Sequence, residues 1–114
     1  MIKTKRIYEL TDPSDGYRVL VDRLWPRGLS KEKAKIDLWL KDLGPSDELR
    51  KWFQHDPEKW AEFKKRYFNE LAGKKELIDQ IRRKEKTTVV TLLFGSKEEK
   101  YNNALALKEY LEKR

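Results

Sequence analysis

The segment spanning residues 87–94 restricts the possible folds more than any other part of this chain. It reads Thr-Thr-Val-Val-Thr-Leu-Leu-Phe, which is the most apolar stretch of the sequence and is rich in β-branched side chains. Such side chains fit the pleated surface of a sheet, and a short apolar run of this length is typical of a buried strand. The segment therefore predicts a central strand, around which the remaining elements must be arranged.

Three other segments carry strand signals. Residues 2–10 place Ile, Tyr and Leu among basic residues, which indicates a strand near the edge of a sheet. Residues 17–24 include three consecutive apolar residues from Val19 to Val21, which predicts a strand covered on both faces. Apolar side chains at positions 36, 38, 40 and 43 fit either a strand or a short helix, and of the two we favour a strand.

Four helices are predicted from apolar spacing and from residues that begin or end helices. Ser46 is suited to cap the first helix, and Asp56 followed by Pro57 is suited to begin the second. The second helix carries an aromatic stripe that we expect in the core, and Gly73 is suited to end it. A third helix is expected around residues 77–84. The last should begin at about residue 97 or 101, because residues 96–99 match a capping box.

This order of elements is typical of a layered α/β domain. We predict a single α/β domain over residues 1–114, with a partly parallel sheet of about three or four strands flanked by helices. A chain of 114 residues is long enough to bury one core, and its four Trp, four Phe and five Tyr supply large apolar rings. This supply argues against disorder, although 41% of the residues are charged.

The charge balance points to anionic partners without identifying one. A net charge of +7 at pH 7 favours nucleic acid, phosphorylated metabolites or a membrane surface. An abundance of Lys and Glu with a single Met is also the composition of a heat-adapted protein, and we favour that explanation. Charge alone therefore does not predict a nucleic-acid-binding protein.

The sequence also excludes several classes of protein and site. It has no run of roughly 18 apolar residues that would span a membrane, and residues 1–6 lack the apolar stretch of a signal peptide. We therefore expect a cytoplasmic protein that does not bind membranes. The absence of Cys excludes disulfides, thiolate catalysis and Cys-based zinc or iron–sulfur sites, and no residue pattern identifies a cofactor.

Polar residues follow the two most apolar predicted strands, where ligands bind in open α/β sheets. Asp22 and Arg23 end the strand of residues 17–24, and Ser96 and Lys97 follow the central strand. If these strands are parallel and adjacent, both sets converge on one crevice. Arg23 would then hold a carboxylate or phosphate, Lys97 would add charge, and Asp22 would act as a general base. Backbone N–H groups after Gly95, at a helix start, would hold the same anion.

The same crevice is expected to include residues 25–28. Arg27 would bind the anion together with Arg23, and Trp25 and Gly28 would complete the ligand-binding loop. We expect Asp22, Arg23, Arg27 and Ser96 in one surface depression. A purely structural alternative is an ion pair between Asp22 and an Arg that locks a tight turn, with Trp25 filling the edge of the core.

Two other positions have both a functional and a structural interpretation. His55 is the only histidine, and it would be catalytic if Asp56 or another carboxylate oriented it; otherwise it is an exposed linker residue or a helix cap. With one His, no metal site of two or more imidazoles can form in one chain. Asp12, Asp15 and Asp22 could bind magnesium, but Asp residues near a turn are more often turn formers, and we predict no metal site.

A family resemblance extends over nearly the whole chain. It is carried by residues 16–30, 37–43, 45–46, 49–53, 55–57, 90–94 and 102–104. These segments resemble the signature of the YeaO-like branch of domain-of-unknown-function family 488, in which Arg-Leu-Trp-Pro-Arg-Gly is specific. The resemblance implies a small bacterial or archaeal α/β protein and brings no established activity. Tyr101 stands where the family often has His, and Phe94 where Tyr is common, which argues against a mechanism needing a second histidine or a phenol there.

Two functions remain open at this stage. The first is a site at the strand-end crevice for a small anionic metabolite, which the protein either only binds or also turns over. The second is a basic nucleic-acid-binding module without catalytic activity.

Overall fold

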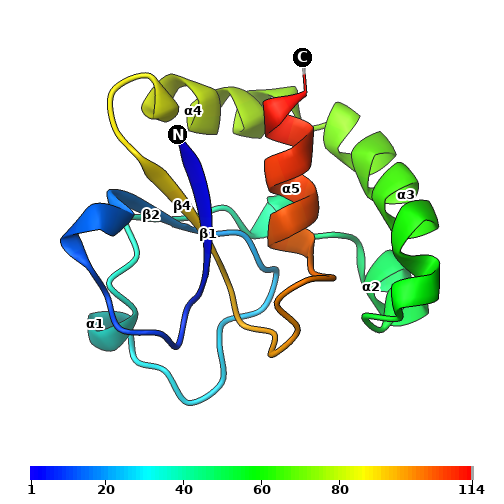
Figure 1. The fold of residues 1–114 in the computed structure, drawn as a ribbon, viewed down its shortest axis with the longest axis horizontal. Helices are drawn as coiled ribbons and strands as arrows, with labels where there is room; N and C mark the ends of the chain where they lie inside the picture. The colour runs from blue at the N-terminus through cyan, green and yellow to red at the C-terminus, as the bar shows by residue number, and fades with distance from the viewer. Residues whose placement is uncertain (114) are drawn as a thin grey trace.

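The computed structural model describes residues 1–113 and shows a parallel sheet with its largest helices gathered on one side (Figure 1). Its elements, in chain order, are β1 (Ile2–Arg6), the 3-10 helix η1 (Pro13–Asp15), β2 (Tyr17–Leu20), α1 (Lys31–Ala34), β3 (Leu38–Trp39), η2 (Lys41–Leu43), α2 (Asp47–Phe53), η3 (Pro57–Lys59), α3 (Trp60–Ala72), α4 (Lys75–Glu85), β4 (Val90–Phe94) and α5 (Asn103–Glu112). The chain is thus the α/β domain that the sequence predicts.

The four strands form one sheet in the order β1-β4-β2-β3, and every neighbouring pair is parallel. The prediction of a central strand at residues 87–94 is confirmed, since β4 lies between β1 and β2 and all five of its residues are buried. The prediction of an edge strand at the N-terminus is also confirmed. Because all strands are parallel, their carboxyl ends lie along the same edge of the sheet.

All four strands are shorter than the sequence suggests. β1 ends at Arg6 and β4 begins at Val90. The predicted strand of residues 17–24 ends at Leu20, and the one expected in residues 36–43 has only two residues before a 3-10 helix begins. Beyond the strand, the carbonyl of Asp22 accepts the indole N–H of Trp39 at 2.7 Å. Asp22 and Arg23 therefore belong to a loop beyond the strand.

The prediction that Ser46 caps α2 is confirmed, whereas Asp56 caps the 3-10 helix η3 that leads into α3, and α3 itself begins three residues later than predicted, at Trp60. The Ser46 hydroxyl accepts the N–H of Leu49 at 3.2 Å, and Asp56 accepts the N–H of Glu58 at 3.0 Å. Gly73 follows the last residue of α3. The predicted core stripe on α3 is confirmed in the buried side chains of Phe63, Tyr67 and Leu71.

Of the two predicted starts of the last helix, residue 97 is wrong and residue 101 is two residues early. Ser96 accepts the N–H of Glu98 at 2.8 Å, but the chain makes a turn there and α5 begins only at Asn103. Asn102 caps α5 instead, because its side chain accepts the N–H of Leu105 at 3.0 Å and donates to the carbonyl of Glu98 at 2.8 Å. The N–H groups after Gly95 are consequently not a helix N-terminus, and the Gly95 N–H donates to Asp22.

The sheet separates a large core from a small one. Along β2 and β4 the side chains alternate, so that Val19 and Leu92 face the large core while Leu20 and Leu93 face the small one. The large core is covered by α2 to α5, of which α5 lies directly on β1 and β4. The small core is covered by α1 and the loop that precedes it.

A buried ion cluster lies at the opposite end of β2 from Asp22. The Asp15 carboxylate receives the Arg18 guanidinium at 2.7 Å and the Lys5 ammonium at 3.1 Å. Asp15 is therefore engaged in the fold and is far along the strand from Asp22. Over residues 1–113, no group of three or more Asp, Glu, His or Cys side chains is placed to hold a metal ion.

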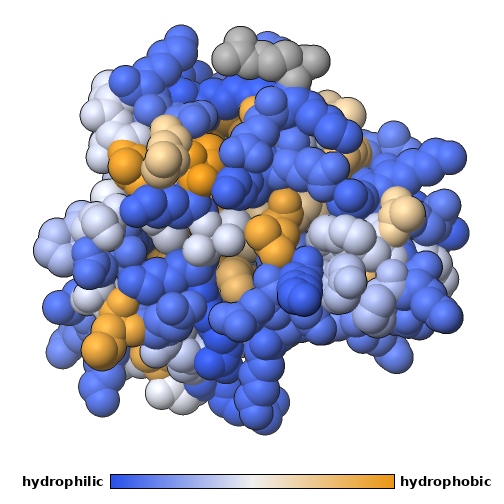
Figure 2. Space-filling view, viewed as in Figure 1, coloured by the Kyte–Doolittle hydropathy of each residue, from blue (hydrophilic) through white to orange (hydrophobic). Residues whose placement is uncertain are grey.

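The surface in Figure 2 is mostly hydrophilic, with hydrophobic groups in small separated areas. In the described part of the chain, no helix has the length and apolar character needed to cross a membrane.

Candidate functional site

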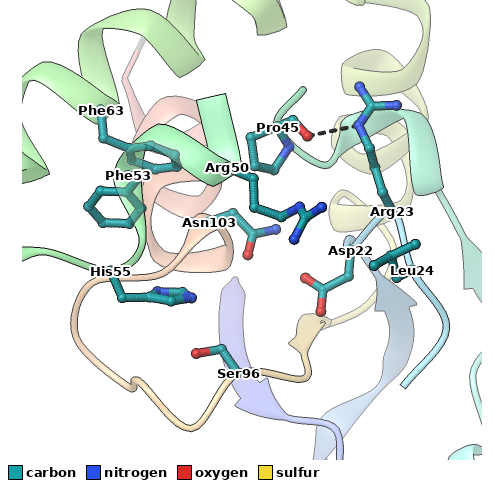
Figure 3. A pocket seen from close by; sticks show the side chains of 10 residues that line it. All are labelled: Asp22, Arg23, Leu24, Pro45, Arg50, Phe53, His55, Phe63, Ser96 and Asn103. Carbon is teal, nitrogen blue, oxygen red and sulfur yellow. Dashed lines mark hydrogen bonds between the residues drawn. The ribbon is translucent and has the colours of Figure 1, made fainter. Parts of the chain in front are cut away.

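A cavity of about 190 Å³ opens beyond the carboxyl ends of β2 and β4; we call it the strand-end cavity (Figure 3). It is lined by Asp22, Arg23, Leu24, Pro45, Arg50, Phe53, His55, Phe63, Ser96 and Asn103. These residues come from two strand-end loops, from α2, α3 and α5, and from the segments that flank α2. The cavity is thus the position at which open α/β sheets bind ligands.

The adjacency of β2 and β4 brings Asp22 and Ser96 to this cavity. Each follows its strand by two residues, and the strands are paired in register from Tyr17 with Val90 onward. One carboxylate oxygen of Asp22, Oδ2, accepts the backbone N–H of Gly95 at 2.8 Å. The expected convergence of the two strand ends is therefore observed.

The Asp22 carboxyl group is partly buried and, within residues 1–113, makes no ion pair at or below 4.0 Å. Burial raises the pKa of the Asp22 carboxyl above its ordinary value, while the amides of Gly95 and Asn103 and the nearby His55 oppose the shift. The group is held in an environment that disfavours its charge, and Figure 3 shows it pointing into the space between Arg50, His55 and Ser96.

Replacing Asp22 by Asn should stabilise the protein at neutral pH, because Asn removes this charge and its oxygen can still accept the Gly95 N–H. The folded-state pKa of Asp22 is raised, so its contribution to stability is fully present below the unfolded-state pKa and is lost as pH rises through the folded-state pKa. Urea denaturation should therefore show wild type gaining stability relative to Asp22→Asn between neutral pH and about pH 3. If the stability of wild type relative to Asp22→Asn stayed constant or fell over this pH range, the raised pKa of Asp22 would be contradicted.

Arg23 lines the cavity but its guanidinium is turned away from Asp22 (Figure 3). Its Nε–H donates to the carbonyl of Pro45 at 2.8 Å, and Nη1 lies 3.9 Å from the Asp42 carboxylate. Gly44 permits this path, since a Cβ there would lie 2.8 Å from the Arg23 backbone nitrogen. Arg23 thus joins the loop after β2 to the segment before α2, and the ion pair with Asp22 that the structural alternative requires is not formed.

Two polar residues line the cavity but were not predicted as site residues from the sequence. Arg50 reaches it from α2, where its guanidinium also lies 3.3 Å from exposed Asp47. Asn103, the first residue of α5, donates its amide N–H to the carbonyl of Val21 at 3.0 Å. Helical spacing does place Arg50 on the same face as the apolar Phe53, but that signal does not say which cavity the face borders.

His55 borders the cavity from the turn between α2 and η3. Gln54 and His55 both have left-handed backbone conformations, with φ of 47° and 56°, which turns the chain sharply after α2. The ring packs 5.5 Å from that of Phe53, and Nδ1 lies 2.7 Å from the carbonyl of Tyr101. Because a carbonyl only accepts, Nδ1 carries a proton and donates it to Tyr101. The carboxylate of Asp56 caps η3, and within residues 1–113 it makes no bond to the ring.

The remaining predicted site residues do not line the cavity. Trp25 belongs to the small core, where its ring packs edge-on against Trp39 at 5.3 Å and its N–H donates to the carbonyl of Leu29. Arg27, Gly28 and Lys97 are exposed and lie outside the cavity lining. Gly95 contributes its N–H to Asp22 rather than to a ligand. The structure therefore brings Asp22, Arg23, His55 and Ser96 together, and separates them from residues 25–28.

Comparison with known proteins gives a family and no activity. The chain matches the family described as "Inactive DUF488-N3 subclade" over residues 1–114. It is 41% identical over 110 residues to the uncharacterised protein YeaO of Escherichia coli, covering 96% of each chain. It is 39% identical over 110 residues to an uncharacterised protein of Mycobacterium tuberculosis, covering 96% of this chain and 92% of that protein. No solved structure matches the chain.

Proposed function

This chain belongs to the inactive DUF488-N3 subclade, and on that premise we propose that it binds a small anionic metabolite in the strand-end cavity without turning it over. One observation carries the proposal: the Arg50 guanidinium and the ionically unpaired Asp22 carboxylate face the same cavity. Arg50 binds the anionic group of the metabolite. Asp22 and His55 orient the remainder of the molecule.

Arg50 is suited to this role because its existing partner is weak. The side chain is 47% exposed, and Asp47, which it meets at 3.3 Å, is 68% exposed. Exposed ion pairs of this kind contribute about 0–1 kcal/mol. A carboxylate or phosphate can therefore replace Asp47, and it can accept two parallel N–H bonds from the guanidinium.

The absence of turnover is supported by the two departures from the family pattern. Phe94 is only 3% exposed and belongs to the large core. The ring of Tyr101 packs edge-on against Trp60 at 5.6 Å, and its backbone carbonyl is the partner of His55. Neither position supplies the additional acid or base that the family resemblance leads one to expect there. This is consistent with the word "inactive" in the description of the subclade.

The dimensions of the cavity limit the ligand. Its volume of about 190 Å³ is below the roughly 300–1,000 Å³ that is usual for drug-sized ligands. Phe53 and Phe63 stack with ring centroids 4.1 Å apart and form an apolar wall. A small metabolite with an apolar portion fits this arrangement better than a polyanion does.

The proposal predicts that a metabolite panel screened by thermal shift will contain an anion that stabilises the wild type saturably. At 100 times its dissociation constant such a ligand adds about 2.7 kcal/mol. Arg50→Gln should weaken this binding by about tenfold or more, because it removes a charge-assisted contact. Arg27→Gln is the matched control and should bind as wild type does, since Arg27 lies outside the cavity lining. Loss of binding in Arg27→Gln but not in Arg50→Gln would place the anion site elsewhere.

Nucleic-acid binding is the alternative, and the net charge of +7 favours it. The aromatic rings offer little support, because several near the surface are already covered by cations. Arg66 and Lys59 lie 4.4 and 5.1 Å from the ring centre of Trp52, and Lys84 lies 4.5 Å from that of Tyr17. Bases would have to displace these cations in order to stack. A steep decrease of affinity for random RNA or DNA with salt would favour the alternative.

A further inference from the structure

The Asp22 carboxylate faces the strand-end cavity and, within residues 1–113, makes no ion pair at or below 4.0 Å. Its Oδ2 accepts the backbone N–H of Gly95 at 2.8 Å. Asn103 donates one amide N–H to the Val21 carbonyl at 3.0 Å, and its side chain also lies beside Asp22 (Figure 3). The Asp22 oxygens are therefore the acceptors that a donor group of a ligand would meet in this cavity.

The charge of Asp22 determines which donor fits best. A ligand hydroxyl would donate to these acceptors but would leave the partly buried carboxylate without a counter-charge. A protonated amine donates up to three hydrogen bonds and also neutralises that charge. Charge-assisted hydrogen bonds are roughly twice as strong as neutral ones. The site therefore favours an ammonium group beside Asp22.

An opposite charge faces the cavity from α2. The Arg50 guanidinium lies more than 4.0 Å from the Asp22 carboxylate, so the two charges border one space without forming a pair. Pro45 and Leu24 extend the apolar wall made by Phe53 and Phe63. The cavity thus offers an acceptor of positive charge, a donor to negative charge and an apolar surface within about 190 Å³.

Resting on the proposed function, we infer that the metabolite is a zwitterion, namely a small apolar α-amino acid, with its ammonium group on Asp22 and its carboxylate on Arg50. The apolar side chain of the amino acid lies against Phe53 and Phe63. The ligand then supplies the counter-charge that Asp22 does not receive from an ion pair within the described part of the protein.

Isothermal titration with matched ligand pairs tests this inference. The probes are L-alanine, L-valine and L-leucine, each with the 2-hydroxy acid that replaces its ammonium group by a hydroxyl. At least one amino acid should bind wild type about tenfold or more tightly than its hydroxy acid. Asp22→Asn should remove that preference, whereas Arg50→Gln should weaken both members of the pair equally. Asp79, a partly exposed carboxylate on α4 that does not line the cavity, gives the matched control Asp79→Asn, which should behave as wild type does.

The outcomes separate the inference from the proposed function. Equal binding of the amino acid and its hydroxy acid by wild type would overturn the zwitterion assignment and leave the anion site in place. Binding of none of the six probes would also overturn the assignment, and the metabolite panel would then decide the proposed function on its own. Thermal unfolding of Asp22→Asn verifies that the variant is folded. If Asp22→Asn does not fold, Arg50→Gln provides the test instead. The inference requires Arg50→Gln to keep the preference for the amino acid over its hydroxy acid, because that preference depends on Asp22. Loss of the preference in Arg50→Gln would contradict the inference.

Discussion

Replacing Asp15 by Ala is expected to lower the free energy of unfolding by about 3–5 kcal/mol, which is the usual cost of breaking a buried ion pair from one side. The Asp15 and Arg18 side chains are 7% and 6% exposed and meet at 2.7 Å. Arg18 also donates to the carbonyls of Ala34 and Lys35 at 2.8 and 3.0 Å, so it cannot withdraw to solvent without breaking the attachment of α1. The variant leaves a buried guanidinium without its counter-charge.

Urea denaturation of wild type and Asp15→Ala measures this loss. Burial opposes ionisation of Asp15, but hydrogen bonds from Lys5, the Asp12 backbone and Arg18 hold the pKa of its carboxyl below its ordinary value. A lowered folded-state pKa gives stability that is present above the unfolded-state pKa and is lost as pH falls through the folded-state pKa. The difference between the two proteins should therefore shrink in acid. Asp79→Ala removes an exposed pair on α4 and should change stability by no more than about 1 kcal/mol.

Trp25→Ala is expected to lower the free energy of unfolding by about 3 kcal/mol. This is near the lower end of the values for removing a core Trp, because the Trp25 ring is only partly buried. The ring fills the small core against Leu20, Ala34 and Leu93, contacts Trp39 edge-on, and donates to the carbonyl of Leu29 at 2.6 Å. Its removal would open a cavity on the face of the sheet that has the thinner cover. Urea denaturation measures the change in midpoint.

Arg27→Ala is the comparison that separates fold from function in residues 25–28. The Arg27 side chain is exposed and makes no ion pair in the described part of the chain, although its backbone carbonyl accepts the Tyr8 hydroxyl at 2.7 Å. Its replacement should change stability by no more than about 0.5 kcal/mol. A loss as large as that of Trp25→Ala would make Arg27 part of the folding core.

Much of the fold was predictable because its signals are local. The β-branched run of residues 87–94 identified the central strand, and Ser46, Asp56 and Gly73 marked helix ends through their own side chains or backbone. The start of α5 was left between residues 97 and 101 because Ser96 and Asn102 are both good caps. The choice between them depends on the bond from the Asn102 amide to the Glu98 carbonyl, which sequence spacing does not show.

The site was predictable only to the extent that strand ends define it. Asp22, Arg23 and Ser96 follow adjacent parallel strands, so reasoning from topology found them. Arg50 and Asn103 lie on helices whose positions depend on packing in the large core. No local sequence pattern indicates that these two residues lie near the strand ends. The orientation of the Arg23 side chain was also not predictable from the sequence, because it depends on a hydrogen bond to the carbonyl of Pro45, 22 residues away.

The measurement that tests the central claim most directly is an amide chemical-shift titration of ¹⁵N-labelled protein with the tightest-binding anion of the metabolite panel. Binding in the strand-end cavity predicts the largest shifts at Gly95, whose N–H donates to Asp22, and at Ser96 and Asn103. It also predicts a shift of the Arg50 side-chain Nε–H. Small or absent shifts at these positions, with the largest shifts along the basic end of α4 at Arg82 and Arg83, would contradict the account and indicate a surface for polyanions instead.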